Sequence, residues 1–386
     1  MDLMEYNSGR WMKQNPGTVS EYKSFLPEMI NHDWSFSDTK INKLLEKGNL
    51  ALGRLESYAE LIPDIDVYIK MHLRTEANKS NKIEGTQTTI EEDLLPLEDV
   101  LPEKRNDHKE INNYIRAINF GVNEVLSFEG GLPLCNRLLK QIHGVLMEGV
   151  RGEYKTPGEF RTSQNWIGGS CISDAVYVPP SIDYLPNLMT DIEMFMNNED
   201  IVIPHLIRIA LLHYQFETVH PFLDGNGRIG RLMIPLYLLS KNILSKPCFY
   251  ISDYFEKHRT EYYNKLQNAR TNNDMTEWIR FFLEASIVTA ETAMEKFKKV
   301  VSFVDETKRM VISLPKKNTQ NIYLVVEAFY SQPILGASQL VKQTNLSAPS
   351  INSILNELVN RNIIVESTGY SRNKIYTMKR YIELFR

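Results

Sequence analysis

The residues best suited to chemistry lie together in one stretch, residues 220–231, which reads HPFLDGNGRIGR. His220 can accept a proton near neutral pH, and Asp224 can hold a hard cation such as Mg²⁺. Arg228 and Arg231 lie three residues apart, so on a helix they would share one face and suit phosphate oxygens. A base, a metal-binding carboxylate and two such cations together predict phosphoryl or nucleotidyl transfer.

Two helices are needed to position these side chains. Apolar residues at helical spacing run up to about Val219, and a second apolar helix follows the stretch. Between the two helices, Pro221 and the DGNG run break the chain, and Gly225 and Gly227 let the backbone bend and approach a ligand closely. A Gly-rich loop that opens a helix presents free backbone N–H groups and the positive end of the helix dipole. The loop therefore predicts an anion site.

The stretch resembles the signature of the Fic family, HPFxDGNGRxxR, at every specified position. The resemblance implies an enzyme that transfers AMP from ATP to Ser, Thr or Tyr hydroxyls of target proteins and that also modifies itself. It implies that His220 deprotonates the hydroxyl and that Asp224 takes Mg²⁺. The residues that it implies for binding the phosphates of ATP are Gly225, Asn226, Gly227, Arg228 and Arg231.

A second motif, SNKIEG, begins at Ser80. Gly85 predicts a helix end in the left-handed conformation, and Glu84 would meet the unfavourable end of that helix's dipole. The motif resembles the inhibitory motif of class II Fic proteins, [Ser/Thr]-x-x-x-Glu-[Gly/Asn]. By that resemblance Glu84 forms a bidentate pair with Arg231, so that ATP binds with its phosphates misdirected. We therefore expect an enzyme restrained by its own chain.

Two further segments would lie near the nucleotide. Between Gly152 and Pro180, short extended runs punctuated by Gly and Pro predict a β-hairpin. This segment resembles the Fic flap, whose sheet edge would align a target protein by strand addition. The residues that the resemblance brings to the nucleotide are Ile167, Gly168, Gly169, Tyr262 and Tyr263, the tyrosines from a later helix. Either tyrosine would stack on the adenine or hydrogen-bond to it.

The expected fold class is mainly α, with a Fic-type helical core, a β-hairpin flap and a C-terminal winged helix-turn-helix domain. The 386 residues are enough for two or three domains. We expect an N-terminal helical segment over residues 1–105, with the inhibitory helix at about 66–85. The catalytic core and its closing helix would span residues 106–312. The winged-helix domain would span 313–386, entered through a linker that includes residues 314–318.

Some local features are also predicted. Residues 1 to about 36 show little periodicity and predict an irregular arm packed on the body. Ser35 or Ser37 can cap the helix that follows, and Thr89 can cap a later helix with acidic residues in its first turn. His143 lies among apolar residues of a helix, which indicates a structural histidine.

Composition narrows the function classes. Hydrophobic content of 42% and charged content of 24% are typical of a soluble globular protein. Three well-separated cysteines and an N-terminus unlike a signal peptide predict a reducing, cytoplasmic location. Apolar runs stay short of the ~18 residues of a membrane span, so no membrane partner is expected. The net charge of −4 gives the whole chain no bulk attraction for nucleic acid.

The C-terminal end carries a net positive charge, unlike the chain as a whole. From residue 313 onward, nine Lys and Arg stand against four Asp and Glu. In the expected winged helix, the third helix exposes small polar residues, and Arg372 and Lys374 lie on the wing. Such a surface could contact DNA, but the modest charge suits a protein partner equally well. The sequence leaves a homodimer open.

Four other functions compete with AMP transfer. The first is transfer of another phosphate group, although the kinase-like Doc branch has Lys where this chain has Gly227. The second is removal of AMP from a modified protein, with Glu84 orienting water. The third is a DNA-binding transcription regulator whose Fic core senses nucleotide. The fourth is a metal hydrolase using His213, His220 and Asp224, which the neighbouring arginines disfavour because they suit phosphate.

Overall fold

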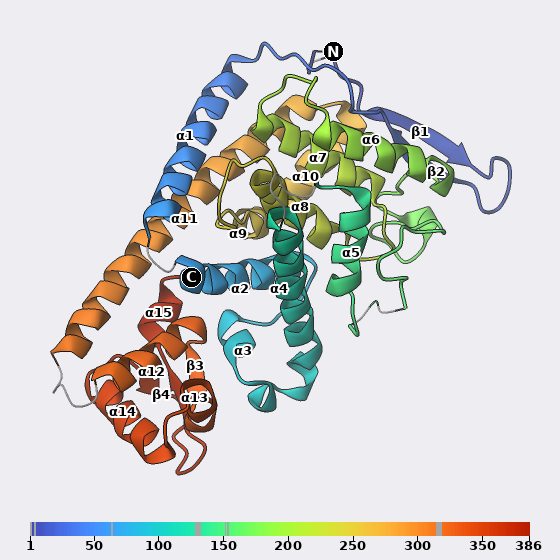
Figure 1. Cartoon of the computed structure of the whole chain (residues 1–386). Coiled ribbons are helices and arrows are strands. Elements are labelled where there is room, and N and C mark those ends of the chain that lie inside the picture. The colour runs from blue at the N-terminus through green and yellow to red at the C-terminus, as the bar shows by residue number, and fades with distance from the viewer. Residues whose placement is uncertain are drawn as a thin grey trace.

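The protein is described from a computed structural model, which is mainly helical (Figure 1). The residues that it describes are all but 1, 4, 63–64, 128–132, 151, 153 and 314–318. The expected linker at 314–318 therefore lies outside the described residues. Among the helices of the described part, none is both long and apolar enough to cross a bilayer.

The chain begins with a β-hairpin rather than the expected irregular arm. Strands β1 (Gly9–Gln14) and β2 (Tyr22–Pro27) are antiparallel. The buried Phe25 ring lies 5.2 Å from Trp11, and its backbone N–H donates to the carbonyl of Val178 at 3.0 Å. The hairpin is thus held by contacts with a distant segment. That explains why the local sequence, with little alternation of its own, led to the wrong prediction.

Helix α1 (Thr39–Leu61) packs along the long helix α11 (Met275–Ile312) (Figure 1). Its N-cap is Asp38, whose carboxylate accepts from the N–H of Ile41 at 2.7 Å and also pairs with Arg280 on α11. The expected cap at Ser35 or Ser37 is therefore wrong. Asp38 can bond the helix N-terminus and the arginine at once, which a serine hydroxyl cannot.

Helix α2 (Ile65–Ile83) packs between α4 (Arg105–Leu126) and α9 (Ser252–Lys257). The buried carboxylate of Glu76 anchors it, accepting from the hydroxyl of Tyr114 at 2.9 Å and from the N–H of Ser252 at 3.1 Å.

Beyond α2, Gly85 has φ +104°, as expected of a residue that stops a helix. Thr89 forms a capping box with Glu92 and starts the short α3 (Ile90–Leu94), also as expected.

Helices α7 (His205–Val219) and α8 (Asn226–Ser240) form the centre of the molecule, and nearly all their residues are buried. The surrounding helices are α4, α5 (Asn136–Leu146), α6 (Leu185–Asn197), α10 (Arg259–Asn272) and α11. Short 3₁₀ helices span Leu97–Asp99, Pro102–Lys104, Ile172–Asp174 and Ile182–Tyr184. The signature stretch, residues 220–231, spans the turn between α7 and α8 and the first residues of α8, so packed helices fix both of its ends.

The expected flap hairpin is reduced to one isolated bridge between Ile167 and Tyr177. The N–H of Ile167 donates to the carbonyl of Tyr177 at 2.8 Å, and the N–H of Tyr177 donates back at 3.1 Å. Gly168 and Gly169 follow with φ of +69° and +75°, which interrupts any strand. The segment folds back on itself as expected, but the prediction of regular strands is wrong.

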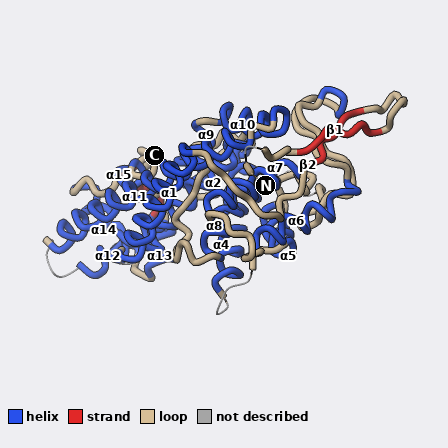
Figure 2. The backbone as a smooth tube through the Cα atoms, turned by 90° about the horizontal axis from the view of Figure 1, so that it is seen from above, coloured by secondary structure: helices blue, strands red, loops and turns tan. Residues whose placement is uncertain are grey.

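The C-terminal unit lies at the opposite end of the molecule from β1 and β2 (Figure 2). Its elements are α12 (Thr319–Ser331), β3 (Ile334–Gly336), α13 (Ala337–Thr344), α14 (Ala348–Asn360), β4 (Val365–Glu366), β5 (Ile375–Thr377) and α15 (Lys379–Glu383). The antiparallel sheet has the order β3-β5-β4. Helix α12 packs on α2, where the rings of Tyr330 and Tyr68 lie 6.5 Å apart. A partner bound to this unit would therefore lie close to α2, the helix that precedes Glu84.

Candidate active site

His220 ends α7 in the left-handed conformation, with φ 50° and ψ 61°. Its ring is partly exposed, and its Nδ1 lies 3.4 Å from the carbonyl oxygen of Glu217. Burial lowers the pKa of His220 to about 4 against the opposing effect of that carbonyl, and the charges of Arg270 and Arg161 lower it further. The imidazole is therefore neutral at pH 7 and able to accept a proton.

Two side chains from the flap segment brace the loop after His220. Arg161 donates from Nε to the carbonyl of His220 at 3.0 Å, and its own N–H donates to the carbonyl of Pro221 at 2.8 Å. Asn165 donates from Nδ2 to the carbonyl of Phe222 at 2.8 Å. The loop is thus held rigidly although it contains several turn-forming residues.

His143 also positions this loop. Its ring stacks on Phe222 with centroids 3.9 Å apart. The N–H of Gly158 donates to Nδ1 at 2.9 Å, so Nε2 carries the proton and donates to the carbonyl of Asp224 at 3.0 Å. The sequence indicated a buried structural histidine, which His143 is. Its direct support of the signature loop was missed, because nothing in the spacing links residues 143 and 224.

The Asn226 side chain bonds to the backbone of the same loop. Its Oδ1 accepts from the N–H of Phe222 and its Nδ2 donates to the carbonyl of Phe222, both at 2.8 Å. Its side chain is buried, and both of its polar atoms bond to the backbone of Phe222. The expected phosphate contacts of the loop would therefore come from backbone N–H groups at the start of α8, where Gly225 precedes the first turn with φ +75°.

Asp224 presents the carboxylate that suits a metal ion. Its side chain is 41% exposed, and its Oδ1 accepts from the N–H of Gly225 at 2.7 Å. Within the described part of the chain, no three His, Cys, Asp or Glu residues cluster as a metal site. One exposed carboxylate beside an anion cradle fits Mg²⁺ shared with phosphates better than an ion held by protein ligands alone.

The alternative trio with His213 does not form. His213 is buried, with Nδ1 3.1 Å from the carbonyl of Gly230 and Nε2 2.9 Å from the hydroxyl of Tyr262. Both ring nitrogens are thus occupied inside the core, away from Asp224.

Arg231 meets Glu84, as the second motif predicted. Arg231 is 1% exposed, and its Nη2 lies 2.5 Å from Oε1 of Glu84, whose side chain is 32% exposed. The expected bidentate pair is wrong, because Nη2 alone contacts Glu84; Nη2 also donates to the carbonyl of Ser80 at 3.1 Å, and Nε donates to the Ser80 hydroxyl at 2.9 Å. Ser80 positions the arginine, and Glu84 reaches it from the solvent side.

The ion pair changes the acidity of both partners. Burial would raise the pKa of Glu84, but Arg231 and then Arg228 hold it below its usual value. Burial would lower the pKa of Arg231, but Glu84 raises it. Both groups are therefore charged at neutral pH, and their contact is a charge-assisted hydrogen bond.

Gly227 makes room for this contact. A Cβ at this position would overlap Oε1 of Glu84 and lie 2.9 Å from Nη1 of Arg231. Any larger residue would push the acid away from the guanidinium. Gly227 therefore permits the contact between Glu84 and Arg231.

Arg228 also lies close to two carboxylates. It is buried, with Nη1 3.3 Å from Oε2 of Glu110 and Nη2 3.6 Å from Oδ1 of Asp224. Glu110 lies on α4, and no sequence pattern connected it to the site. It holds the arginine beside the loop, in reach of the Asp224 carboxylate.

The two tyrosines of α10 differ in their surroundings. Tyr262 is 1% exposed and hydrogen-bonds to His213, so it has little free surface for the predicted contact with an adenine. Tyr263 is 41% exposed, and the Arg259 guanidinium lies 5.8 Å from its ring centre. A helix cannot point neighbouring residues in one direction, so only one of the pair can face the opening.

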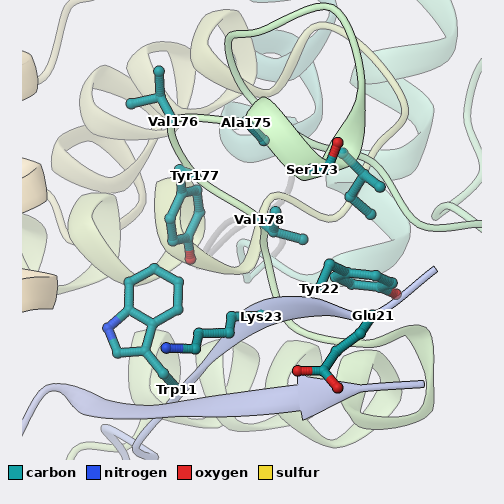
Figure 3. A pocket seen from close by; sticks show the side chains of 10 residues that line it. Trp11, Glu21, Tyr22, Lys23, Ser173, Ala175, Val176, Tyr177 and Val178 are labelled. Atoms are coloured by element: carbon teal, nitrogen blue, oxygen red, sulfur yellow. The ribbon is translucent and has the colours of Figure 1, made fainter. Parts of the chain in front are cut away.

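A groove of about 410 Å³ lies between the N-terminal hairpin and the flap. Figure 3 shows Trp11 pointing from the hairpin toward Tyr177 of the flap, with the Lys23 side chain extending toward Trp11. The Tyr177 hydroxyl donates to the carbonyl of Thr218 at 2.6 Å, two residues before His220. The groove thus adjoins the end of α7.

Comparisons with known proteins agree with this geometry. Residues 42–123 match the family model of the Fic/DOC family N-terminal region, and residues 133–238 match the Fic/DOC family model. "Protein adenylyltransferase Fic" from Aedes aegypti is 30% identical over 174 residues, which is 45% of this chain and 30% of that protein. The same-named protein of Drosophila erecta is 32% identical over 135 residues, 35% of this chain and 24% of that protein. The chain thus spans less than a third of the length of these relatives.

Solved structures show the same fold. A Fic family protein from Desulfovibrio desulfuricans superposes with a TM-score of 0.54 at 21% identity, covering 90% of this chain and 98% of the other. A Fic domain containing signaling protein from Bacteroides thetaiotaomicron gives 0.52 at 20% identity, covering 67% and 96%. The signature loop and the contact between Glu84 and Arg231 thus lie in residues 42–238, the part of the chain that matches the two Fic/DOC family models.

Proposed function

We propose that this chain is a protein adenylyltransferase that transfers AMP from ATP to hydroxyls of target proteins and is restrained by Glu84. The observation that carries the proposal is a neutral, partly exposed His220 beside the Gly-rich start of α8, where Arg231 is buried against Glu84. The name of the Aedes aegypti relative supports the reaction type. Self-modification belongs to the same proposal.

In the proposed reaction the target hydroxyl oxygen attacks the α-phosphorus of ATP. The bond from that phosphorus to the oxygen shared with the β-phosphate breaks, and diphosphate leaves. His220 takes the hydroxyl proton. Asp224 would hold Mg²⁺, which supplies charge neutralisation on the phosphates. Backbone N–H groups at the start of α8 and Arg228 would steady the phosphates, and Arg231 would bind the terminal one.

The restraint follows from the Arg231 contact. While Glu84 occupies the guanidinium, the terminal phosphate of ATP lacks its cation and meets a carboxylate instead. ATP would then bind with its α-phosphorus out of line for attack, and positioning provides most of the catalysis in such transfers. Withdrawal of Glu84 activates the site.

A target segment would lie along the flap. The groove beside it has walls from both Trp11 and Tyr177, so a target side chain next to the modified hydroxyl could enter it. Of the two tyrosines of α10, Tyr263 has the exposed surface for the adenine, and Ile167, Gly168 and Gly169 would line the flap side.

Radioactive ATP distinguishes the reaction from its rivals. We expect protein labelling from α-labelled ATP and none from γ-labelled ATP, because AMP retains only the α-phosphate. Label from γ-labelled ATP would instead establish phosphorylation. DNA binding without labelling of either wild type or Glu84→Gly would favour a nucleotide-sensing regulator. Loss of AMP from pre-labelled protein in the absence of diphosphate would instead show hydrolytic removal of AMP.

Replacing Asp224 with alanine should lower labelling about a hundredfold, as removal of one electrostatic contribution to a transfer site typically does. The measurement is a Mg²⁺ titration of labelling in the Glu84→Gly background. The matched control is Asp183→Ala, which removes a carboxylate that bonds to Ser181, away from the signature loop. An unaltered Mg²⁺ response of the Asp224 variant would rule out its role in holding the ion.

The low pKa of His220 predicts a particular pH profile. The neutral imidazole is the form that accepts the proton, and the pKa of about 4 keeps it neutral above about pH 5. Titration of His220 should therefore leave the labelling rate of Glu84→Gly unchanged from pH 6 to 8. The rate should fall only as the pH approaches 4. A decline centred near pH 6.5 that depends on His220 would contradict this assignment.

For the remaining parts of the chain, we propose that residues 313–386 are a winged-helix domain contacting DNA or a protein partner. The order of its elements, with the sheet β3-β5-β4, supports this. The boundaries at residues 105 and 312, the cytoplasmic location and a homodimer stay predictions.

A further inference from the structure

A second carboxyl group, that of Glu217, lies beside the Arg231–Glu84 pair and has no role in the mechanism above. It belongs to the last turn of α7 and is 7% exposed. Its Oε1 lies against Gly230, so closely that a Cβ on that glycine would overlap it. Within the described part of the chain this oxygen has no hydrogen-bond partner, and Arg231 forms its ion pair with Glu84 instead.

Such a carboxyl favours its protonated form. Burial raises the pKa of Glu217 to about 7; Arg231 lowers it, Glu84 raises it, and Arg270 lowers it. A buried carboxylate without a donor is costly, and the guanidinium next to it is already neutralised by Glu84. The balance changes if Glu84 leaves, because Arg231 would then lose the carboxylate that it contacts directly, while the buried Glu76 that also interacts with it is occupied by Tyr114 and Ser252.

We propose that Glu217 is a reserve counter-charge for Arg231: it holds a proton while Glu84 occupies the guanidinium and releases that proton to water when Glu84 withdraws. The inference rests on the proposed function, in which Glu84 must leave before the terminal phosphate arrives. Arg231 is 1% exposed, and an uncompensated charge at such a site strongly disfavours the arrangement. Ionised Glu217 would keep the arginine in place until a phosphate binds.

Among the described titratable groups that surround Glu217, none has a pKa close to neutral pH, so Glu217 is the one whose charge changes there. They are His213 and His220 on its own helix, Arg231 on α8, Tyr262, Tyr263 and Arg270 on α10, and Glu84 after α2. Burial lowers the pKa of His213 to about 3 and that of His220 to about 4, so both are neutral from pH 6 to 8. Burial raises the pKa of both tyrosines, and Glu84 is already ionised.

The proposal predicts that inhibition depends on pH. The restrained state binds one more proton than the released state, so rising pH favours release. The effect acts below the pKa of about 7 that Glu217 has in the restrained state and levels off above it. If ionised Glu217 in the released state has a pKa near or below 5, release should be about tenfold more favourable at pH 8 than at pH 6.

The first experiment compares the labelling rate of wild type with that of Glu84→Gly at each pH, because their ratio cancels titrations common to both. We expect the ratio to rise about tenfold from pH 6 to 8. In a Glu217→Gln background the amide cannot ionise, so the ratio should stay flat near its acidic value. Glu103→Gln, a change at an exposed acid without a resolved role, should keep the wild-type slope. A flat ratio in wild type, or an unchanged slope in Glu217→Gln, would overturn the proposal.

The second experiment needs no catalysis, so its failure is separate from failure of the proposed function. The infrared band of protonated carboxyl groups is recorded at pH 6 in wild type, Glu84→Gly and Glu217→Gln. We expect wild type to contain one more protonated carboxyl than either variant. Equal bands in wild type and Glu84→Gly would show that Glu217 does not change its charge with Glu84. Because that comparison leaves Glu217 in place, it holds even if Glu217→Gln fails to fold.

Discussion

Replacing Glu84 with glycine should raise self-labelling from α-labelled ATP about tenfold or more. The contact that is lost is a charge-assisted hydrogen bond between Oε1 of Glu84 and Nη2 of Arg231 at 2.5 Å. Hydrogen bonds to charged groups contribute about 1.5–3 kcal/mol, and 1.4 kcal/mol corresponds to a factor of about ten. Because the Glu84 side chain is 32% exposed, solvent screening favours the lower end of that range.

The structure also indicates why this change should leave the fold intact. Glu84 lies just beyond the last residue of α2, and the buried anchor of that helix is Glu76, two turns earlier. Arg231 keeps its two bonds to Ser80 when Glu84 is absent. The variant should therefore unfold at nearly the same temperature as wild type.

Matched variants separate loss of the contact from other effects. Glu84→Gln keeps the shape and removes the charge, so it should release most of the activity, whereas Glu103→Gln should behave as wild type. Gly227→Ala offers an independent approach, because its Cβ would displace the Glu84 carboxylate. It should weaken inhibition, although the same Cβ crowds the loop and would lower the maximal rate. Equal labelling by wild type and Glu84→Gly would remove the case for restraint by this residue.

The signature loop and its acid partner could be predicted from the sequence because their residues form dense local motifs. His220 and Asp224 fall in the turn between two apolar helices, the arginines follow at the start of the second helix, and Glu84 sits where a helix end disfavours an acid. Such features follow from the order of residues along the chain. The pairing of Glu84 with Arg231 additionally required the family resemblance, since 147 positions separate the two.

The supporting residues could not be predicted, because their roles arise only from tertiary packing. Glu110 reaches Arg228 from α4, and His143 reaches the loop from α5. The N-terminal hairpin escaped notice for the same reason, since Phe25 is fixed by the flap and not by its own strand pattern. Tyr262 and Tyr263 were predicted as equivalent, and only the packing of α10 shows which one is buried.

Replacing His220 with alanine should abolish labelling, with a loss of about a thousandfold, because general base catalysis contributes about 10²–10⁴ in rate. The loss must be measured in the Glu84→Gly background, where the starting rate is high enough to show it. Nucleotide binding should persist, since the N–H groups at the start of α8, Arg228 and Arg231 are unchanged.

His258→Ala is the matched control for that experiment. His258 lies between α9 and α10 with a side chain 43% exposed, so its loss removes an imidazole without touching the loop. A wild-type rate for the control with normal ATP binding by His220→Ala would place the defect in proton transfer. Retention of more than a tenth of the activity by His220→Ala would mean that another base accepts the proton. Glu217 would then be the group to test, because its carboxyl is the acid of α7 nearest in sequence to His220 and, by the proposal above, it is ionised when Glu84 is absent.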